Sequence, residues 1–322
     1  MDRRPAHART LRARESYSLR SSLSAPGTAA WGGLPERDRA LLRWLLVGDL
    51  VTSELAAILV YGSLRSARRR LARLVELRLV RGFWAANSQR PRGRYAYALT
   101  ASARLDLERA AGYAPVGRRR AGPGPSTIHR LATNDLLAAF LRDAHPAHGL
   151  GLLAWLPERI AAQLFDGYVE PDAVAIIGTP TASIGLIVER DLGTESASVL
   201  AAKVARYTTI LAGRDGPAVN IAIVVESPKR VASIRRVVEP ASTEGAPVRI
   251  SVAADLMADP YGSTWTSSDD RRLRTTELPG GAGSDNALFG ALCLLEVESL
   301  EAFDGSAVAT FPALAHFARR IR

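Results

Sequence analysis

The spacing of apolar residues predicts three helices between residues 35 and 78. The first contains four leucines between positions 41 and 46, and the second begins at Thr52 or Ser53. The third spans Leu64–Arg78 and begins after Ser63, a residue type that caps helix N-termini. Its apolar positions repeat at the i, i+3, i+7 spacing of one buried helix face. They are Leu64, Ala67, Leu71, Leu74 and Val75.

The pattern then changes to that of a hairpin. Leu79–Asn87 and Arg94–Thr100 are rich in Val, Phe, Trp and Tyr, which favours strands, and residues 88–93 form a turn with two arginines. Three helices followed by a hairpin with a basic tip is the element order of a winged helix-turn-helix. We therefore predict a winged helix domain over residues 34–112.

The remainder of the chain predicts a second, α/β (α+β) domain over residues 127–260. Four apolar runs typical of buried strands alternate with helix signals, which indicates three layers around a central mixed sheet. The runs are Ala173–Ile177, Ser183–Asp191, Ala218–Val225 and Val248–Val252. Gly and Pro in 113–126 predict a linker that few contacts cross. Residues 1–33 read as a disordered basic arm, and 261–322 as a loop and C-terminal tail.

Charge divides the chain at the same linker. Residues 1–126 contain 24 Lys or Arg and 9 Asp or Glu, whereas residues 127–322 contain 18 and 23. A basic first part is a candidate for binding nucleic acid. An arginine-rich coding bias is the other explanation, since only Lys203 and Lys229 are lysines, but it does not explain the shortage of acids before residue 126.

Composition also excludes several classes of protein. The single cysteine, Cys293, rules out an intrachain disulfide and a cysteine-built zinc site. The longest uncharged run, residues 173–188, is shorter than the roughly 20 apolar residues of a membrane span. The arginine-rich N-terminus lacks the apolar segment of a secretory signal. We therefore expect a cytoplasmic protein that does not associate with membranes.

The third helix and the hairpin tip present the arginines that we expect to contact DNA. Three of them repeat at i, i+4, i+8 on the helix, opposite the apolar stripe, as a helix in the major groove requires. A solvated helix face, or a winged helix used for protein contacts, would place them in the same way. The predicted DNA-binding residues are Arg65, Arg68, Arg69, Arg70 and Arg73 on the helix, and Arg90, Arg92 and Arg94 on the wing.

Three acidic residues in the second domain predict a metal site. Asp172 begins one strand, while Glu189 and Asp191 lie two residues apart on the next and so share one side of it. Such oxygen ligands suit Mg²⁺, which polarises a phosphodiester and lowers the pKa of a bound water. Lys203 and Tyr207 lie one helical turn apart on the following helix, and we assign them catalytic roles, with Lys203 stabilising charge on the phosphate. Surface charges and an ordinary salt bridge are the alternative.

The chain resembles the replication-relaxation family of plasmid and mobile-element proteins in the order and spacing of short motifs over roughly residues 34–213. The motifs include Leu34-Pro35-Glu36-Arg37-Asp38, Arg65-Ser66-Ala67-Arg68-Arg69-Arg70-Leu71, Tyr95-Ala96-Tyr97-Ala98-Leu99-Thr100, His129-Arg130-Leu131-Ala132-Thr133-Asn134-Asp135, Pro171-Asp172, Val188-Glu189-Arg190-Asp191, Gly193-Thr194-Glu195, and Lys203 with Tyr207. The resemblance implies a role in plasmid replication, relaxation or mobilisation.

The second domain also looks like the PD-(D/E)xK nuclease fold of restriction endonucleases, which implies metal binding by Asp172 and Glu189. The lysine of that motif is replaced here by Asp191. Either Lys203 substitutes for it from the helix, or the nuclease chemistry is lost. An upstream helix acid is also usual in that fold, and Asp135 and Glu158 are both candidates.

Three functions follow from these predictions. The first is an accessory protein that binds double-stranded DNA, alone or with other replication or relaxosome proteins. The second is a Mg²⁺-dependent nickase or nuclease that uses Asp172, Glu189 and Lys203. The third is a winged-helix transcription regulator whose second domain binds a ligand or partner. The DNA sequence recognised and the oligomeric state do not follow from the sequence.

Overall fold

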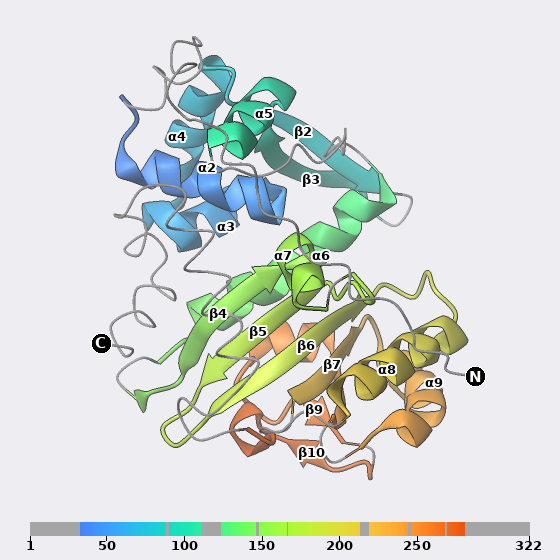
Figure 1. Ribbon diagram of the computed structural model, residues 1–322. Helices are drawn as coiled ribbons and strands as arrows, with labels where there is room; N and C mark the ends of the chain where they lie inside the picture. Colours follow the sequence, from blue (N-terminus) through green and yellow to red (C-terminus); the bar gives the residue numbers. More distant parts are fainter. Residues whose placement is uncertain are drawn as a thin grey trace, which may run out of the picture. The chain divides into compact units, whose positions relative to one another are not determined.

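The computed structural model of the chain describes residues 33–87, 90–110, 124–145, 148–165, 167–212, 219–243, 246–267 and 269–280 (Figure 1). The predicted arm, most of the predicted linker and the C-terminal tail lie outside these ranges. The elements below all belong to one compact unit that begins at Pro35. The fold is mixed α+β with two sheets, which confirms the predicted class.

Three helical segments precede a β-hairpin, in the order that the sequence predicts. They are α2 (Glu36–Gly48), α3 (Ser53–Ala56) with its π-helical continuation Ala57–Tyr61, and α4 (Leu64–Glu76). The predicted caps are present, because the hydroxyl of Thr52 accepts a hydrogen bond from the Leu55 amide and that of Ser63 accepts one from the Ser66 amide. Gly62 ends the second segment with φ of 74°, a left-handed conformation that favours glycine.

The buried face of α4 is narrower than predicted. Ala67, Leu71 and Leu74 are fully buried, but Leu64 and Val75, at the two ends of the helix, are exposed. The expectation that all five apolar residues face the core is therefore wrong at both ends. Only the central turns of the helix lie against its neighbours.

The hairpin is part of a three-stranded antiparallel sheet. Strands β2 (Val80–Asn87) and β3 (Arg90–Leu99) pair with each other, and the short strand β1 (Leu50–Val51) adds to β3, giving the order β1-β3-β2. Helix α5 (Ala101–Ala110) follows. Strand β1 was not expected from the sequence, because a strand of two residues gives no periodic signal.

Helix α6 (Pro125–Arg142) packs on this small sheet as well as on the large one. Leu131 and Ile128 cover Leu50, Ala85 and Ala96, so an element assigned to the second domain completes the core of the first. Polar contacts add to this packing, since the guanidinium of Arg94 on β3 donates to both oxygens of Asp135 at 2.6 and 2.7 Å. The prediction that few contacts join the two parts is therefore wrong.

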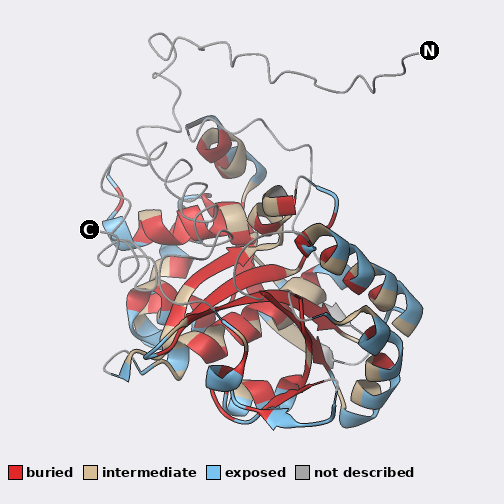
Figure 2. Cartoon of the chain, turned by 60° about the horizontal axis from the view of Figure 1, so that its bottom comes forward, coloured by how far each residue is buried: buried red, intermediate tan, exposed pale blue. Residues whose placement is uncertain are grey.

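The second sheet has seven strands in the order β10-β9-β8-β7-β6-β5-β4. Strands β6, β7 and β8 are parallel, and the other neighbours are antiparallel. The strands are β4 (Gly151–Pro157), β5 (Ala173–Gly178), β6 (Ser183–Asp191), β7 (Val219–Val225), β8 (Val248–Val252), β9 (Trp265–Thr266) and β10 (Arg272–Leu273). The central strands are buried along their length, as Figure 2 shows.

Helices cover both faces of this sheet. Helices α8 (Ala197–Leu211) and α9 (Pro228–Val238) pack on one face, while α6 and α10 (Ala253–Ala258) lie on the other (Figure 1). The short helix α7 (Glu158–Ala161) follows β4. The sequence therefore predicted correctly a layered α/β arrangement around a central mixed sheet.

The predicted loop after residue 260 is an exception. It contains β9 and β10, which extend the sheet, and Trp265 is buried with its indole N–H donating to the Thr275 hydroxyl at 2.9 Å. Two-residue strands among Gly, Ser and Asp leave no periodic pattern in the sequence. The α/β part therefore continues past residue 260, to at least Leu273.

Candidate functional site

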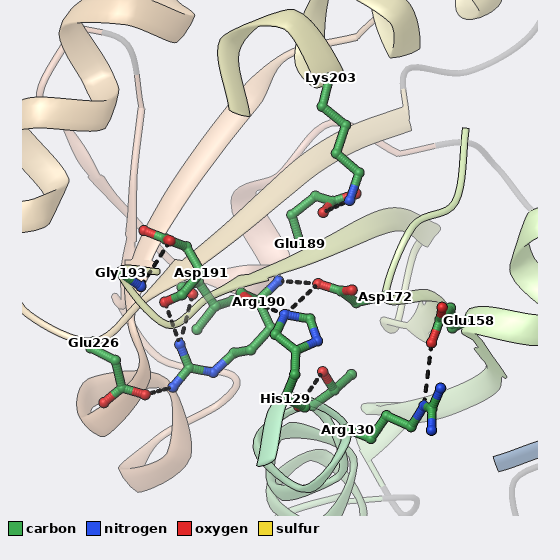
Figure 3. A network of polar contacts seen from close by, with 12 residues as sticks. His129, Arg130, Glu158, Asp172, Glu189, Arg190, Asp191, Gly193, Lys203 and Glu226 are labelled. Atoms are coloured by element: carbon green, nitrogen blue, oxygen red, sulfur yellow. Dashed lines mark hydrogen bonds and ion pairs between the residues drawn. The ribbon is translucent and has the colours of Figure 1, made fainter. Parts of the chain in front are cut away.

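A buried cluster of charged residues lies where β6 meets α8. The carboxylate of Glu189 on β6 accepts a hydrogen bond from the Lys203 ammonium on α8 (Figure 3). It also accepts one from the Tyr207 hydroxyl on the same helix. Lys203 and Tyr207 are one helical turn apart, so both reach the same strand. The predicted grouping of these three residues is present in the structure.

Burial controls the ionisation of this cluster. Burial and the nearby negative charge of Asp172 together raise the pKa of Glu189 to about 8, although the Lys203 ammonium and the Tyr207 hydroxyl oppose the shift. The pKa of Asp172 is also raised, mainly by burial. The pKa of Lys203 is raised by the negative charge of Glu189 and Asp172, despite its desolvation. Both buried carboxyl groups therefore favour their protonated, uncharged forms more than exposed carboxyl groups do.

Asp172 joins the cluster from the start of β5. Its side chain accepts a hydrogen bond from the Arg190 amide at 2.6 Å, and the Nε2 atom of His129 lies 3.4 Å from it. The same His129 atom donates to the Arg190 carbonyl at 2.6 Å, because a carbonyl oxygen can only accept. His129 on α6 and Lys203 on α8 therefore approach Asp172 and Glu189 from opposite faces of the sheet (Figure 3).

Asp191 does not converge on the other two acids. Its carboxylate pairs with the guanidinium of Arg230 on α9, with an Nε to Oδ2 distance of 2.6 Å, and accepts from the Gly193 amide at 2.9 Å. Glu189 and Asp191 do share one side of the strand, but each pairs with a different helix. Asp191 therefore ties β6 to α9, and the three acids do not form one site.

Tyr207 is fully buried, which excludes it as a nucleophile on DNA in this conformation. Burial and the neighbouring carboxylates raise the pKa of its hydroxyl far above the usual value. The phenol therefore stays protonated and acts as a hydrogen-bond donor that positions Glu189. About a quarter of the Lys203 side chain is exposed, so of the two residues with predicted catalytic roles only Lys203 is accessible to solvent.

The donor set does not match a Mg²⁺ site as the side chains stand. Mg²⁺ requires free oxygen ligands in octahedral geometry. Both oxygens of Glu189 already accept from protein donors, and one oxygen of Asp172 accepts from a backbone amide. Within the ranges that the structure describes, no group of three or more His, Cys, Asp or Glu residues is placed to hold a metal. The Lys203 ammonium supplies the positive charge that balances this cluster.

Of the two candidate upstream acids, Glu158 is the one near the cluster. Its negative charge contributes to the raised pKa of Asp172, and its carboxylate lies 3.4 Å from the Arg130 guanidinium. Asp135 instead pairs with Arg94 on the small sheet. The structure therefore favours Glu158 as the acid associated with the cluster.

Three further residues around the cluster were not predicted as site residues. His129 and Arg230 pair with Asp172 and Asp191, and the buried guanidinium of Arg190 donates to the Val224 carbonyl at 2.9 Å and pairs with Glu226. Arg190 is flanked by two acids in the sequence, but nothing in the local pattern indicates that its side chain is buried. His129 and Arg230 are distant in sequence, and only the packing of α6 and α9 on the sheet brings them close.

The predicted recognition helix presents an exposed arginine face. Arg65, Arg68, Arg69 and Arg73 are exposed on α4. In the described part of the chain no ion pair engages Arg65 or Arg69, while Arg73 pairs with Glu76 at 2.9 Å and Arg68 lies 4.0 Å from Glu54. Both pairs are solvent-exposed and therefore weak, so a phosphate can displace them.

Arg70 and Arg94 take structural positions in place of the predicted DNA contacts. Arg70 pairs with the fully buried Asp38 of α2, which also accepts from the Tyr61 hydroxyl at 2.9 Å. Arg94 is held by Asp135 of α6. The buried carboxylate of Asp38 requires a cation, and this requirement decides where Arg70 points. The side chains of Arg90 and Arg92 lie outside the described residues.

The fold and the site define a mixed α+β protein that combines an arginine-rich helix and small sheet with a layered α/β part containing a buried carboxylate–ammonium cluster. The family model described as replication-relaxation matches residues 42–224, more than half of the chain. The chain therefore belongs to the replication-relaxation family. No curated protein and no solved structure gives a significant match.

Family membership suggests a role in the replication or relaxation of plasmid or mobile-element DNA. The residues matched include all of α4 and the Asp172, Glu189 and Lys203 cluster. No helix among the described residues is long and apolar enough to cross a membrane.

Proposed function

We propose that the protein binds duplex DNA of a plasmid or mobile element through the exposed arginines of α4, as an accessory factor in replication, relaxation or mobilisation. The exposed arginine face of α4 is the observation that carries the proposal. Its residues lie opposite the buried Ala67, Leu71 and Leu74, as in a winged helix that inserts its third helix into the major groove. The guanidinium groups then reach phosphates and guanine edges.

The stabilisation of α4 supports this use. The ion pair of Arg70 with Asp38 ties the helix to α2 on its inner side, while Arg65 and Arg69 are exposed on the outer side. A helix held rigidly at its back presents its exposed side chains at small entropic cost. One arginine of α4 therefore fixes the position of the helix, and the exposed arginines are left to contact DNA, as a recognition helix requires.

Measurement of DNA binding against salt tests the proposal. The double variant Arg65→Ala/Arg69→Ala should weaken binding to duplex DNA and reduce the slope of log K against log salt by about 2, close to one per lost phosphate contact. Arg206→Ala/Arg236→Ala removes two exposed arginines from α8 and α9 and is the matched control. Binding and salt slope that change equally in both double variants would refute the role of α4.

The buried cluster supports an accessory role over a nuclease. Its two carboxyl groups are engaged by Lys203 and by donors of the protein itself, which leaves the positive charge of that lysine, and not a metal ion, to balance them. A supercoiled-plasmid nicking assay with Mg²⁺ or Mn²⁺ tests this. We expect no nicking by the wild-type protein. Nicking that is lost in Glu189→Ala would overturn the accessory role and establish the nickase alternative.

A further inference from the structure

The hairpin has an exposed aromatic surface that the proposed duplex contacts do not use. Trp84 on β2 is 61% exposed and Tyr95 on β3 is 41% exposed, and Tyr97 beside them is half-buried. Ala85 and Ala96 alternate with them along the strands and are buried on the opposite face, under α6. Exposed aromatic side chains gathered in one place are a candidate interaction surface.

The three rings form one ordered row. Trp84 and Tyr95 are direct cross-strand partners, with ring centroids 5.1 Å apart and planes at 72°. The rings of Tyr95 and Tyr97 are also 5.1 Å apart, at 82°. Gly82 provides the space for Tyr95, because a Cβ at position 82 would lie 2.7 Å from its ring carbons. Rings fixed in this way lose little entropy when they bind a ligand.

The row lines one wall of a groove of about 560 Å³. The other walls come from the start of α3, at Thr52, Ser53 and Glu54, and from Arg68 of α4. The volume is in the range of sites that bind small molecules or single ligand groups. The groove thus lies between the predicted recognition helix and the predicted wing.

The charges around the groove indicate the chemistry of its occupant. Arg68 is 64% exposed and its ion pair with Glu54 is long and exposed, so its guanidinium is available to a phosphate. Arg65 and Arg69 lie on the same helix without ion pairs to described residues. Aromatic rings beside arginines match a ligand that has flat apolar groups and negative charge together. Nucleotides have both, and their base faces are free to stack only when the strand is unpaired.

We infer that this groove binds unpaired nucleotides of a locally opened DNA strand, with bases stacked on Trp84 and Tyr95 and phosphates near Arg68. The inference rests on the proposed DNA-binding function and specifies its substrate. A protein that holds duplex with α4 and an unpaired strand with the hairpin face would recognise DNA at a junction or a melted region. Replication and relaxation both produce such regions.

A comparison of two DNA probes tests the inference. One probe is a fully paired duplex that contains a short run of thymines in one strand. The other has the same thymine strand, but the opposite strand is non-complementary along that run, so the thymines are unpaired. We expect the wild-type protein to prefer the bubble. Trp84→Ala should reduce affinity for the bubble about tenfold, in line with loss of one stacked base, and leave duplex affinity unchanged. Trp84→Phe should restore the preference, because it keeps a stacking ring.

Two further measurements separate stacking from other causes. Gly82→Ala keeps all three rings but displaces Tyr95, so it should weaken bubble binding only. The side chain of Trp84 is exposed, so its variants should unfold at the wild-type temperature. Equal wild-type affinity for both probes, or Trp84 variants that alter duplex and bubble binding equally, would overturn the inference and leave the duplex proposal standing. A wild-type protein that binds neither probe would overturn both.

Discussion

Replacement of Glu189 by Gln should remove a large pH-dependent part of the stability of the protein. Burial raises the pKa of this carboxyl from 4.5 to about 8, so the folded state binds more protons than the unfolded chain between these two pH values. Stability therefore falls as the pH rises through this window. Each unit of pKa difference corresponds to about 1.4 kcal/mol, and between pH 5 and pH 7 the loss from this group is about 2 to 3 kcal/mol.

Urea unfolding at pH 5, 6, 7 and 8, followed by the fluorescence of the buried tryptophans, measures this effect. The stability of the wild-type protein relative to Glu189→Gln should decline by that amount from pH 5 to pH 7, since glutamine does not titrate. Glu239 is exposed on the surface, so Glu239→Gln is the control and should follow the wild-type curve. Parallel curves for the wild-type protein and Glu189→Gln, or a wild-type advantage that grows with pH, would refute the reasoning.

Three other substitutions test the contacts described above. Lys203→Met should extend the loss of stability past pH 8 when the same titration is continued to higher pH, because the buried carboxyl loses the ammonium that lowers its pKa; an unchanged upper limit would contradict this. Arg70→Ala should cost about 3 kcal/mol in urea unfolding, since it leaves the buried Asp38 without its cation, whereas the exposed Arg69→Ala should cost about 0.5 kcal/mol or less. Leu131→Ala should cost about 2 to 4 kcal/mol. It should also speed amide exchange in β2 and β3 if α6 completes the core of the small sheet, and exchange that increases only around β4 would argue against that role.

Local sequence patterns determined most of the secondary structure. The apolar spacing of α4 and the hydroxyl caps at Thr52 and Ser63 act within a few residues, so they can be read without the fold. The long buried strands β5, β6 and β7 are continuous apolar runs, so they too can be recognised from local sequence alone. The sequence also placed Glu189 and Lys203 near one another, because strand and helix are consecutive and the helix returns along the strand, but their direct ion pair corresponds to the salt-bridge alternative and not to the predicted phosphate contact.

Only the tertiary structure decided how the charged side chains are used. Arg65 and Arg70 belong to the same basic run, yet the buried Asp38, distant in sequence, makes Arg70 structural and leaves Arg65 exposed. Asp191 lies two residues from Glu189 but pairs with α9, because α8 and α9 pack side by side on the sheet. A charge takes the partner that packing brings within a few ångströms, and no local pattern records that partner.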